Sequence, residues 1–366
     1  MDNDIILVIV VAAALAFDFT NGFHDTANAV ATMISTRAMS PRQAVALASV
    51  LNFVGAFISL AVAATIASGI VDAAVITPTI VFAGLVGATA WNLITWFFGL
   101  PSSSSHALIG GVIGAAFAAE GAAAINGQGV VDKVLIPALI APILAFGVAA
   151  LAIMLAYRIV GRLRPGPVNR GYRLGQVVSG SLFSLAHGTN DAQKTMGVIA
   201  LALTANGNLD SGAAIPTWVV VSAATAIAAG TWVGGWRIIR TMGTRIIKMD
   251  PAQGFSAQSS GAVVVFAASH FGFPLSTTHT IAGAVMGSGA GKRLSAVRWG
   301  VAGNIAFAWL LTLPAAALMG GLVEGVMELF GTGAVGPLVI AIALVVMLAV
   351  IFGRRAAQGR LLTAED

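Results

Sequence analysis

The chain has 366 residues, of which 58% are hydrophobic and only 9% are charged, and it contains no cysteine. This composition is typical of a polytopic membrane protein, and it excludes a large soluble domain, disulfides and thiolate chemistry. The formal net charge is +5, but the basic residues are scattered over short connections between apolar segments. We therefore expect a lipid bilayer as partner and no nucleic acid.

Apolar segments follow one another along the chain. Because unpaired backbone cannot face hydrocarbon and alternation with period two is absent, they are predicted to be helices rather than strands of a barrel. The amino terminus has no basic stretch before its first apolar run, so that run is interpreted as a retained helix. The predicted fold is an all-α polytopic membrane protein with about 10 to 12 membrane segments. They cover approximately residues 5–34, 43–69, 79–99, 101–118, 133–159, 173–205, 215–238, 255–271, 274–290, 299–320 and 335–353.

The connections between these segments differ in charge. All Lys and Arg residues except Lys133 and Lys194 lie in five of them, near residues 37–42, 158–173, 237–248, 292–298 and 354–360. The positive-inside rule assigns this basic set to the cytoplasm. Threading the chain accordingly places the amino terminus outside and the carboxyl terminus in the cytoplasm, provided that 79–118 and 255–290 are hairpins. The expected location is the cell (inner) membrane.

The two halves of the chain share a polar motif within an apolar segment. FDFTNGFHDTAN begins at Phe17, and its residues Phe17, Gly22 and Asp25 match Phe183, Gly188 and Asp191 at a constant offset of 166. Since the threading carries the two copies in opposite directions, the halves are predicted to be inverted repeats. The repeats are assigned to residues 1–160 and 173–353, with a basic cytoplasmic linker at 161–172 and a cytoplasmic tail at 354–366.

A second motif is also duplicated, at an offset of 173. GLPSSSSHALIGGVIG begins at Gly99 and GFPLSTTHTIAGAVMG begins at Gly272, so that Pro101 matches Pro274 and His106 matches His279. Inverted repeats that contain interrupted helices indicate a transporter site near the bilayer midplane.

Proline followed by hydroxyl residues predicts a helix start whose free backbone N–H groups and positive dipole end point forward. Two such starts that face each other would form a cage of donors suited to a tetrahedral oxyanion. Ordinary N-capping of a buried helix is the alternative for each motif taken alone. The predicted anion-binding residues are Ser103, Ser104, Ser105, Ser276, Thr277 and Thr278.

The carboxylates of the polar motifs are predicted to hold compensating cations. Carboxylate and amide oxygens, together with carbonyl groups freed from an interrupted helix, form a ligand set for hard cations. Asn21, Asp25 and Asn28 would build one such site, and Asn190 and Asp191 would build its mirror. A structural carboxylate that pairs with a neighbour is the alternative for each Asp.

The two predicted cation sites are not identical, because Asn28 of the first repeat corresponds to Lys194 of the second. We hypothesise that the ammonium group of Lys194 replaces one coupling cation and pairs with Asp191 or with the substrate. Histidines in the motifs, such as His24, could carry protons, because an imidazole titrates near neutrality. Each histidine alone is more often a hydrogen-bonded helix contact.

These motifs resemble those of the inorganic phosphate transporter (PiT) family, most closely its bacterial Pit-type members. The resemblance rests on NGFHDTANAVAT, WNLITWFFGLPSSSSH, SLAHGTNDAQKTMG and FPLSTTHTIAG, which span both halves. It implies an inverted-repeat symporter for orthophosphate, without a cofactor. It implies cation ligands at Asp25, Asn28 and Asp191, and phosphate ligands at the two hydroxyl clusters. Sodium-coupled relatives have Asn where this chain has Lys194, so the resemblance favours proton coupling. It also implies that the transported form could be a metal phosphate complex, as in some similar Lys-containing bacterial members.

Several rival functions remain open at this stage. Another tetrahedral oxyanion such as sulfate could be the substrate, Na⁺ could be the coupling ion, and a passive anion channel could replace the symporter. An intramembrane hydrolase using Ser104 or Ser105 with His106 is disfavoured, because adjacent residues on a helix start do not face each other. A homodimer is expected from the resemblance, and Gly-rich faces such as Gly110 to Gly114 permit close helix packing.

Overall fold

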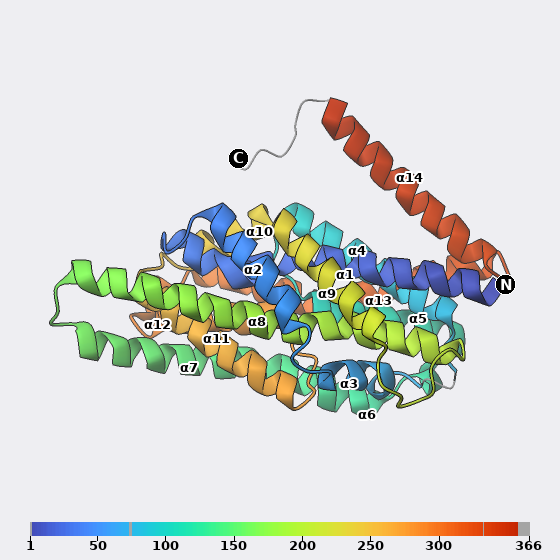
Figure 1. The fold of residues 1–366 in the computed structure, drawn as a ribbon, viewed down its shortest axis with the longest axis horizontal. Helices are drawn as coiled ribbons and strands as arrows, with labels where there is room; N and C mark the ends of the chain where they lie inside the picture. Colours follow the sequence, from blue (N-terminus) through green and yellow to red (C-terminus); the bar gives the residue numbers. More distant parts are fainter. Residues whose placement is uncertain (1, 73–74, 332, 358–366) are drawn as a thin grey trace.

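The computed structural model describes residues 2–72, 75–331 and 333–357, and these are almost entirely helical. The helices form an elongated bundle from which the last helix projects (Figure 1). They are α1 (Asp2–Ser35), α2 (Pro41–Gly55), α3 (Ala61–Gly69), α4 (Pro78–Phe98), α5 (Ser104–Glu120), α6 (Gly127–Val130), α7 (Ile136–Val160), α8 (Pro165–Ala205), α9 (Thr217–Val233), α10 (Trp236–Arg240), α11 (Pro251–His270), α12 (Thr277–Ala290), α13 (Trp299–Glu328) and α14 (Val335–Ala357).

The two polar motifs lie inside long, uninterrupted helices. FDFTNGFHDTAN is part of α1, and its counterpart around Asp191 is part of α8. The prediction that these motifs free helix carbonyls for a cation is therefore wrong. Helix α1 is continuous, so its backbone carbonyl groups stay hydrogen-bonded within the helix. The hydroxyls of Thr20 and Thr26 also donate to the carbonyls of Phe17 and Gly22 on the same helix.

The glycines that mark the repeat allow helices to approach closely. A Cβ atom at Gly22 would lie 2.3 Å from the carbonyl oxygen of Ile227 in α9. A Cβ atom at Gly188 would lie 2.2 Å from the carbonyl oxygen of Asn52 in α2. Both glycines therefore fix backbone contacts that position the polar faces of α1 and α8.

The predicted helical hairpins are confirmed as α4 with α5 and α11 with α12. In the first, Gly99 adopts a left-handed conformation (φ 66°) at the end of α4, and α5 begins at Ser104. In the second, Gly272 has φ 73° after α11, and α12 begins at Thr277. Glycine accepts this conformation without steric cost, so each hairpin turns sharply before its second helix.

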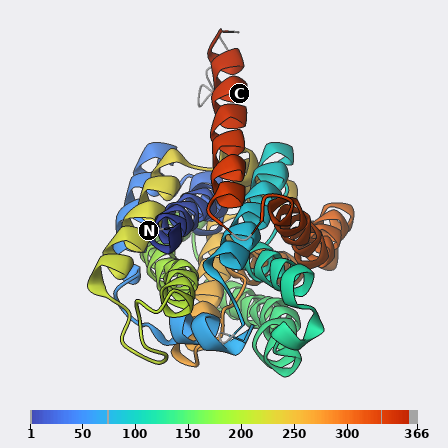
Figure 2. The same ribbon diagram turned by 90° about the vertical axis from the view of Figure 1, so that its right-hand side faces the viewer.

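The helix that follows each hairpin packs against the hairpin of the other half of the chain. Helix α7 lies against α11 and α12, whereas α13 lies against α4 and α5. Figure 2 shows the bundle end-on, with α14 rising away from it. Short backbone bridges, Val71 to Ile125 and Ile247 to Val297, occur at related places in the two halves. Each hairpin is thus packed against a helix from the other half of the chain.

Several predicted segments are divided differently in the structure. The segment predicted at 43–69 consists of α2 and α3, and the segment at 215–238 consists of α9 and α10. Helix α8 begins at Pro165, so residues 165–172 of the predicted linker are helical. Of the predicted tail, residues 354–357 belong to α14, and the rest lies outside the described residues.

Within the described residues, four helices are long and apolar enough to cross a membrane, or five if one pair bent by 64° counts as a single span. The other predicted segments are shorter or more polar. The full-length candidates are Asp4–Ser35, Pro78–Phe98, Gly127–Val160 and Trp299–Glu328, and the bent pair is Thr217–Val233 with Trp236–Arg245.

Candidate functional site

A buried polar centre lies where α1 and α8 meet the two hairpins. Asp25 is 2% exposed, Asp191 0% and Lys194 2%. Ionisable groups this deep in an apolar protein are costly unless they are paired or functional.

Asp25 joins the two hairpins. Its Oδ1 atom accepts hydrogen bonds from the hydroxyls of Ser104 (3.2 Å) and Thr278 (3.4 Å), which begin α5 and α12. The ring nitrogen Nδ1 of His24 lies 2.7 Å from the same oxygen. One carboxylate oxygen is thus contacted by a hydroxyl from each hairpin.

Asp191 has a related set of neighbours on α8. Its Oδ1 atom lies 2.6 Å from the ammonium Nζ of Lys194, one turn further along the helix. Its Oδ2 atom accepts a hydrogen bond from Thr277 (3.3 Å), and Nε2 of His187 lies 3.4 Å away. Lys194 therefore pairs with Asp191, as one branch of our hypothesis expected.

Asn28 contacts the second hairpin, whereas Lys194 contacts both hairpins. The amide of Asn28 donates to Thr278 at 2.9 Å and lies 3.4 Å from the hydroxyl of Thr277. The ammonium group of Lys194 donates to Ser105 at 2.5 Å and to the carbonyl of Leu275 at 2.8 Å. The two repeats thus use an amide and an ammonium group for equivalent contacts.

Asp25, His187 and Asp191 form a cluster that could hold a cation. One ligand atom from each residue lies within 4.8 Å of the others, and all three residues are buried. Two carboxylates supply the negative charge and hard oxygen atoms that small cations prefer. This arrangement fits the cation role predicted for both aspartates.

The predicted hydroxyl clusters divide into two groups. Ser103 and Ser276 are N-caps, whose hydroxyl oxygens accept the backbone N–H groups of His106 (3.1 Å) and His279 (3.2 Å). For these two residues the capping alternative describes the geometry. Ser104, Ser105, Thr277 and Thr278 instead contact Asp25, Asp191, Lys194 or Asn28.

Asn190 and Asn21 were predicted to bind cations, but no hydrogen bond among the described residues joins either side chain to Asp25 or Asp191. The amide of Asn190 donates to Ser269 (2.9 Å) and to the carbonyl of Phe273 (3.1 Å), so it holds the second hairpin. Asn21 lies beside Asp18, on the same face of α1 as Asp25, and its Oδ1 atom has no hydrogen-bond partner among the described residues.

Comparison with known proteins identifies the family to which the chain belongs. The model of the phosphate transporter family matches residues 21–173 and 164–320. The chain belongs to the phosphate transporter family. It is therefore a transporter and an integral membrane protein rather than an enzyme, as the motifs of the sequence predicted.

Named relatives cover most of the chain. A protein of Mycobacterium tuberculosis (strain ATCC 25618 / H37Rv), named a probable low-affinity inorganic phosphate transporter, is 55% identical over 327 residues, which are 89% of this chain and 78% of that protein. A protein of Rhizobium meliloti (strain 1021) with the same name is 50% identical over 318 residues, covering 87% and 95%. A solved structure described as the sodium-dependent phosphate transporter superposes with a TM-score of 0.79 at 25% identity, covering 88% and 99%.

The geometry of this phosphate transporter family member also argues against the hydrolase alternative. Ser104 donates to Asp25, and Ser105 donates to the carbonyl of Leu275 (3.1 Å). The ring of His106 instead meets the ring of His279 edge to face, with 4.7 Å between centroids. Neither serine hydroxyl is directed by His106 as a nucleophile would be.

The sequence predicts only a general proton role for the motif histidines, including His187, and it does not assign His187 or Thr95 to the site. His187 lies four residues before Asp191 on one helix face and corresponds to the predicted residue Asn21 at the offset of 166. This repeat register could have identified it. Thr95 lies 3.1 Å from Nε2 of His24 and accepts a hydrogen bond from Ser102 (2.8 Å). No pattern in the sequence pairs these two hydroxyls with His24.

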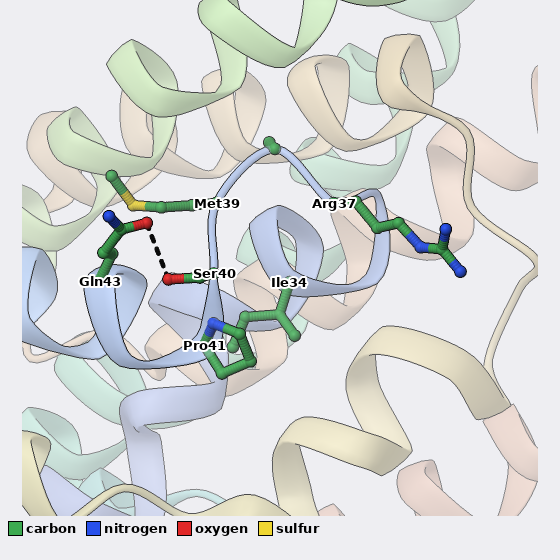
Figure 3. A pocket seen from close by; sticks show the side chains of 7 residues that line it. Ile34, Arg37, Met39, Ser40, Pro41 and Gln43 are labelled. Carbon is green, nitrogen blue, oxygen red and sulfur yellow. Dashed lines mark hydrogen bonds between the residues drawn. The ribbon is translucent and has the colours of Figure 1, made fainter.

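An open pocket of about 650 Å³ lies at the end of α1, away from this centre. Ile34 in its wall is nine residues beyond Asp25, about 14 Å along the helix axis. Figure 3 shows Ser40 donating to Gln43 (2.7 Å), with the side chain of Arg37 pointing away from this pair. The pocket is lined by the connection between α1 and α2 and the adjoining helix ends, and its lining does not include the buried carboxylates.

Proposed function

We propose that this chain is a secondary active symporter that imports inorganic phosphate across the cell (inner) membrane. The observation that carries the proposal is the convergence of Ser104 and Thr278, from opposite hairpins, on one oxygen of Asp25. Hydroxyl groups, helix N-termini and buried carboxylates at one point are what an oxyanion and its compensating cations require.

Phosphate would be bound by the first turns of α5 and α12. Ser104, Ser105, Thr277 and Thr278 supply hydroxyl donors, and the free backbone N–H groups of the same turns add further donors. Ser103 and Ser276 hold these helix starts in place through their caps. When cations occupy the carboxylates, the hydroxyls that now contact Asp25 and Asp191 become available to phosphate oxygens.

Cations would be bound by Asp25, Asn28 and Asp191, with His24 positioned to exchange a proton with Asp25. Proton coupling is favoured because Lys194 already places a fixed positive charge 2.6 Å from Asp191. Sodium coupling is the second candidate, supported by the likeness to a structure described as sodium-dependent. The transported form could also be a metal phosphate complex.

The remaining proposals concern topology and assembly. The charge distribution of the loops supports an outside amino terminus and a cytoplasmic carboxyl terminus. The apolar faces that the long helices expose, for example at Ile143 and Leu310, are compatible with lipid or a second copy of the chain. A homodimer is proposed on the basis of family membership.

Replacing Lys194 with Asn is expected to raise the number of cations transported with each phosphate by one. The fixed ammonium charge beside Asp191 would then have to be supplied by a mobile ion. The reversal potential of phosphate transport in proteoliposomes, measured for both proteins, gives this number. An unchanged cation dependence would remove the role assigned to Lys194.

Labelled phosphate uptake into proteoliposomes, driven by an imposed proton or sodium gradient, tests the proposed function. We expect uptake to require a gradient and to persist in excess sulfate, because a phosphate that carries a proton also donates a hydrogen bond to the Asp25–Asp191 centre, which sulfate cannot do. Preferential inhibition by sulfate would assign sulfate as substrate. Uptake that ignores both gradients would indicate a channel.

A further inference from the structure

Asp18 is a third buried carboxylate of the polar motif, and the proposed function does not use it. It is fully buried, with an exposed fraction of 0%. Neither of its oxygens has a hydrogen-bond partner among the described residues. It lies seven residues before Asp25 on α1, about 10 Å along the helix axis. A carboxylate in such a place needs a compensating charge or proton.

The neighbours of Asp18 are oxygen-bearing side chains that also lack partners. Asn21 of α1 and Thr195 of α8 lie beside its carboxyl group, yet no hydrogen bond of normal geometry joins either to it. Oδ1 of Asn21 and the hydroxyl of Thr195 have no partner among the described residues, and both residues are at most 1% exposed. Both carboxyl oxygens of Asp18, Oδ1 of Asn21 and the hydroxyl of Thr195 are thus buried oxygen atoms on neighbouring side chains that lack hydrogen-bond partners among the described residues.

Nearby charges do not neutralise Asp18. Asp191 and Lys194 are close enough to act on it electrostatically, with opposite signs. The ammonium group of Lys194 is, however, already held by Asp191, Ser105 and the carbonyl of Leu275. The positive charge is therefore committed to the polar centre.

The internal repeat shows that this cluster exists on one side only. At the offset of 166, Asp18 corresponds to Ser184, and Thr195 corresponds to Ala29. The hydroxyl of Ser184 donates to the carbonyl of Gly180 on its own helix at 2.8 Å, so it needs no other partner. The acidic residue and the threonine hydroxyl are therefore present in only one of the two halves.

We propose that Asp18, Asn21 and Thr195 form a binding site for a coupling cation, separate from the cluster of Asp25, His187 and Asp191. The ligand is a hard monovalent cation, Na⁺ or a proton, because a single carboxylate charge with neutral oxygen atoms matches one positive charge. Together with the topology proposed above, the site lies on the outer side of the polar centre. A cation entering from outside reaches it before it reaches Asp25.

This inference rests on the proposed function, and measuring transport stoichiometry tests it. The full chain and Asp18→Asn are reconstituted in proteoliposomes, and the cation-to-phosphate ratio is obtained from reversal potentials. One arm imposes a proton gradient without Na⁺, and the other imposes a Na⁺ gradient at fixed pH. We compare the two proteins under whichever gradient drives phosphate uptake by the unsubstituted protein. Under that gradient, we expect Asp18→Asn to transport one cation fewer per phosphate. A merely structural role would lower the rate and leave the ratio unchanged.

Two further variants cover the case in which Asp18→Asn does not fold or does not transport. Thr195→Val removes one ligand oxygen and keeps the side-chain shape, so the Na⁺ concentration for half-maximal uptake should rise about tenfold if the cation is Na⁺. If the cation is a proton, the proton concentration for half-maximal uptake should fall, because the hydroxyl no longer favours the ionised carboxylate. Ser184→Ala, at the position equivalent to Asp18, should leave this concentration unchanged. An unaltered ratio in Asp18→Asn, or an unaltered concentration in Thr195→Val, overturns the inference. Absence of phosphate uptake by the unsubstituted protein would instead contradict the proposed function.

Discussion

Replacing Asp25 with Asn is expected to reduce phosphate uptake by at least about 100-fold, equivalent to roughly 2.7 kcal/mol. Oδ1 of Asp25 receives the hydroxyls of Ser104 and Thr278 and lies 2.7 Å from His24. A neutral amide offers no negative charge to a cation, and it keeps only one oxygen that can accept hydrogen bonds or bind a cation. The loss should appear in the initial rate of labelled phosphate uptake by proteoliposomes.

Asp132→Asn is the matched control for this substitution. Asp132 is exposed, and its carboxylate accepts a hydrogen bond from Gln128 (2.8 Å) outside the polar centre. The control should transport phosphate at the rate of the unsubstituted protein. If Asp25→Asn is folded and retains uptake within about threefold of it, less than 1 kcal/mol, the central role of Asp25 is refuted.

The second large effect concerns stability. Replacing Gly114 with Ala is expected to lower the melting temperature of the purified protein by about 1 to 4 °C, because overpacking costs about 1 to 3 kcal/mol. A Cβ atom at Gly114 would lie 1.9 Å from the carbonyl oxygen of Ala317, where α5 crosses α13. Backbone cannot yield to it as a flexible side chain would, so the two helices must separate.

Gly147→Ala provides the same chemical change at an open position. A Cβ atom at Gly147 in α7 would meet nothing within 4 Å. The melting temperature of this variant should be unchanged or slightly higher, because Ala is the better helix former. Equal melting temperatures for the two variants in thermal unfolding assays would contradict the close packing of α5 on α13.

Repetition made much of the fold predictable. Each half has the same order of a polar helix followed by a Gly-Pro-hydroxyl hairpin, and the register identified both hairpins. The second helices begin at Ser104 and Thr277, three residues after the predicted starts at 101 and 274. Asp25, Asp191 and Lys194 were found because charged side chains are rare in apolar segments. Composition and register together were enough for these features.

Features that depend on contacts between distant segments were not predictable. Helix α1 stays continuous through its polar motif because side chains from other helices satisfy the motif, as Thr278 does for Asp25. Lys194 reaches Ser105, 89 positions away in the sequence. The packing of α7 and α13 on the opposite hairpins likewise has no local signal.

The most direct test of the account is to locate the bound anion. Arsenate is a tetrahedral analogue of phosphate whose arsenic atom gives an anomalous X-ray signal, so crystals of the protein grown with arsenate would show its position. We expect one peak between the first turns of α5 and α12, within hydrogen-bonding reach of Ser104, Ser105, Thr277 and Thr278 and beside the Asp25–Asp191 pair. A peak elsewhere, with these four hydroxyls facing away from it, would contradict the account.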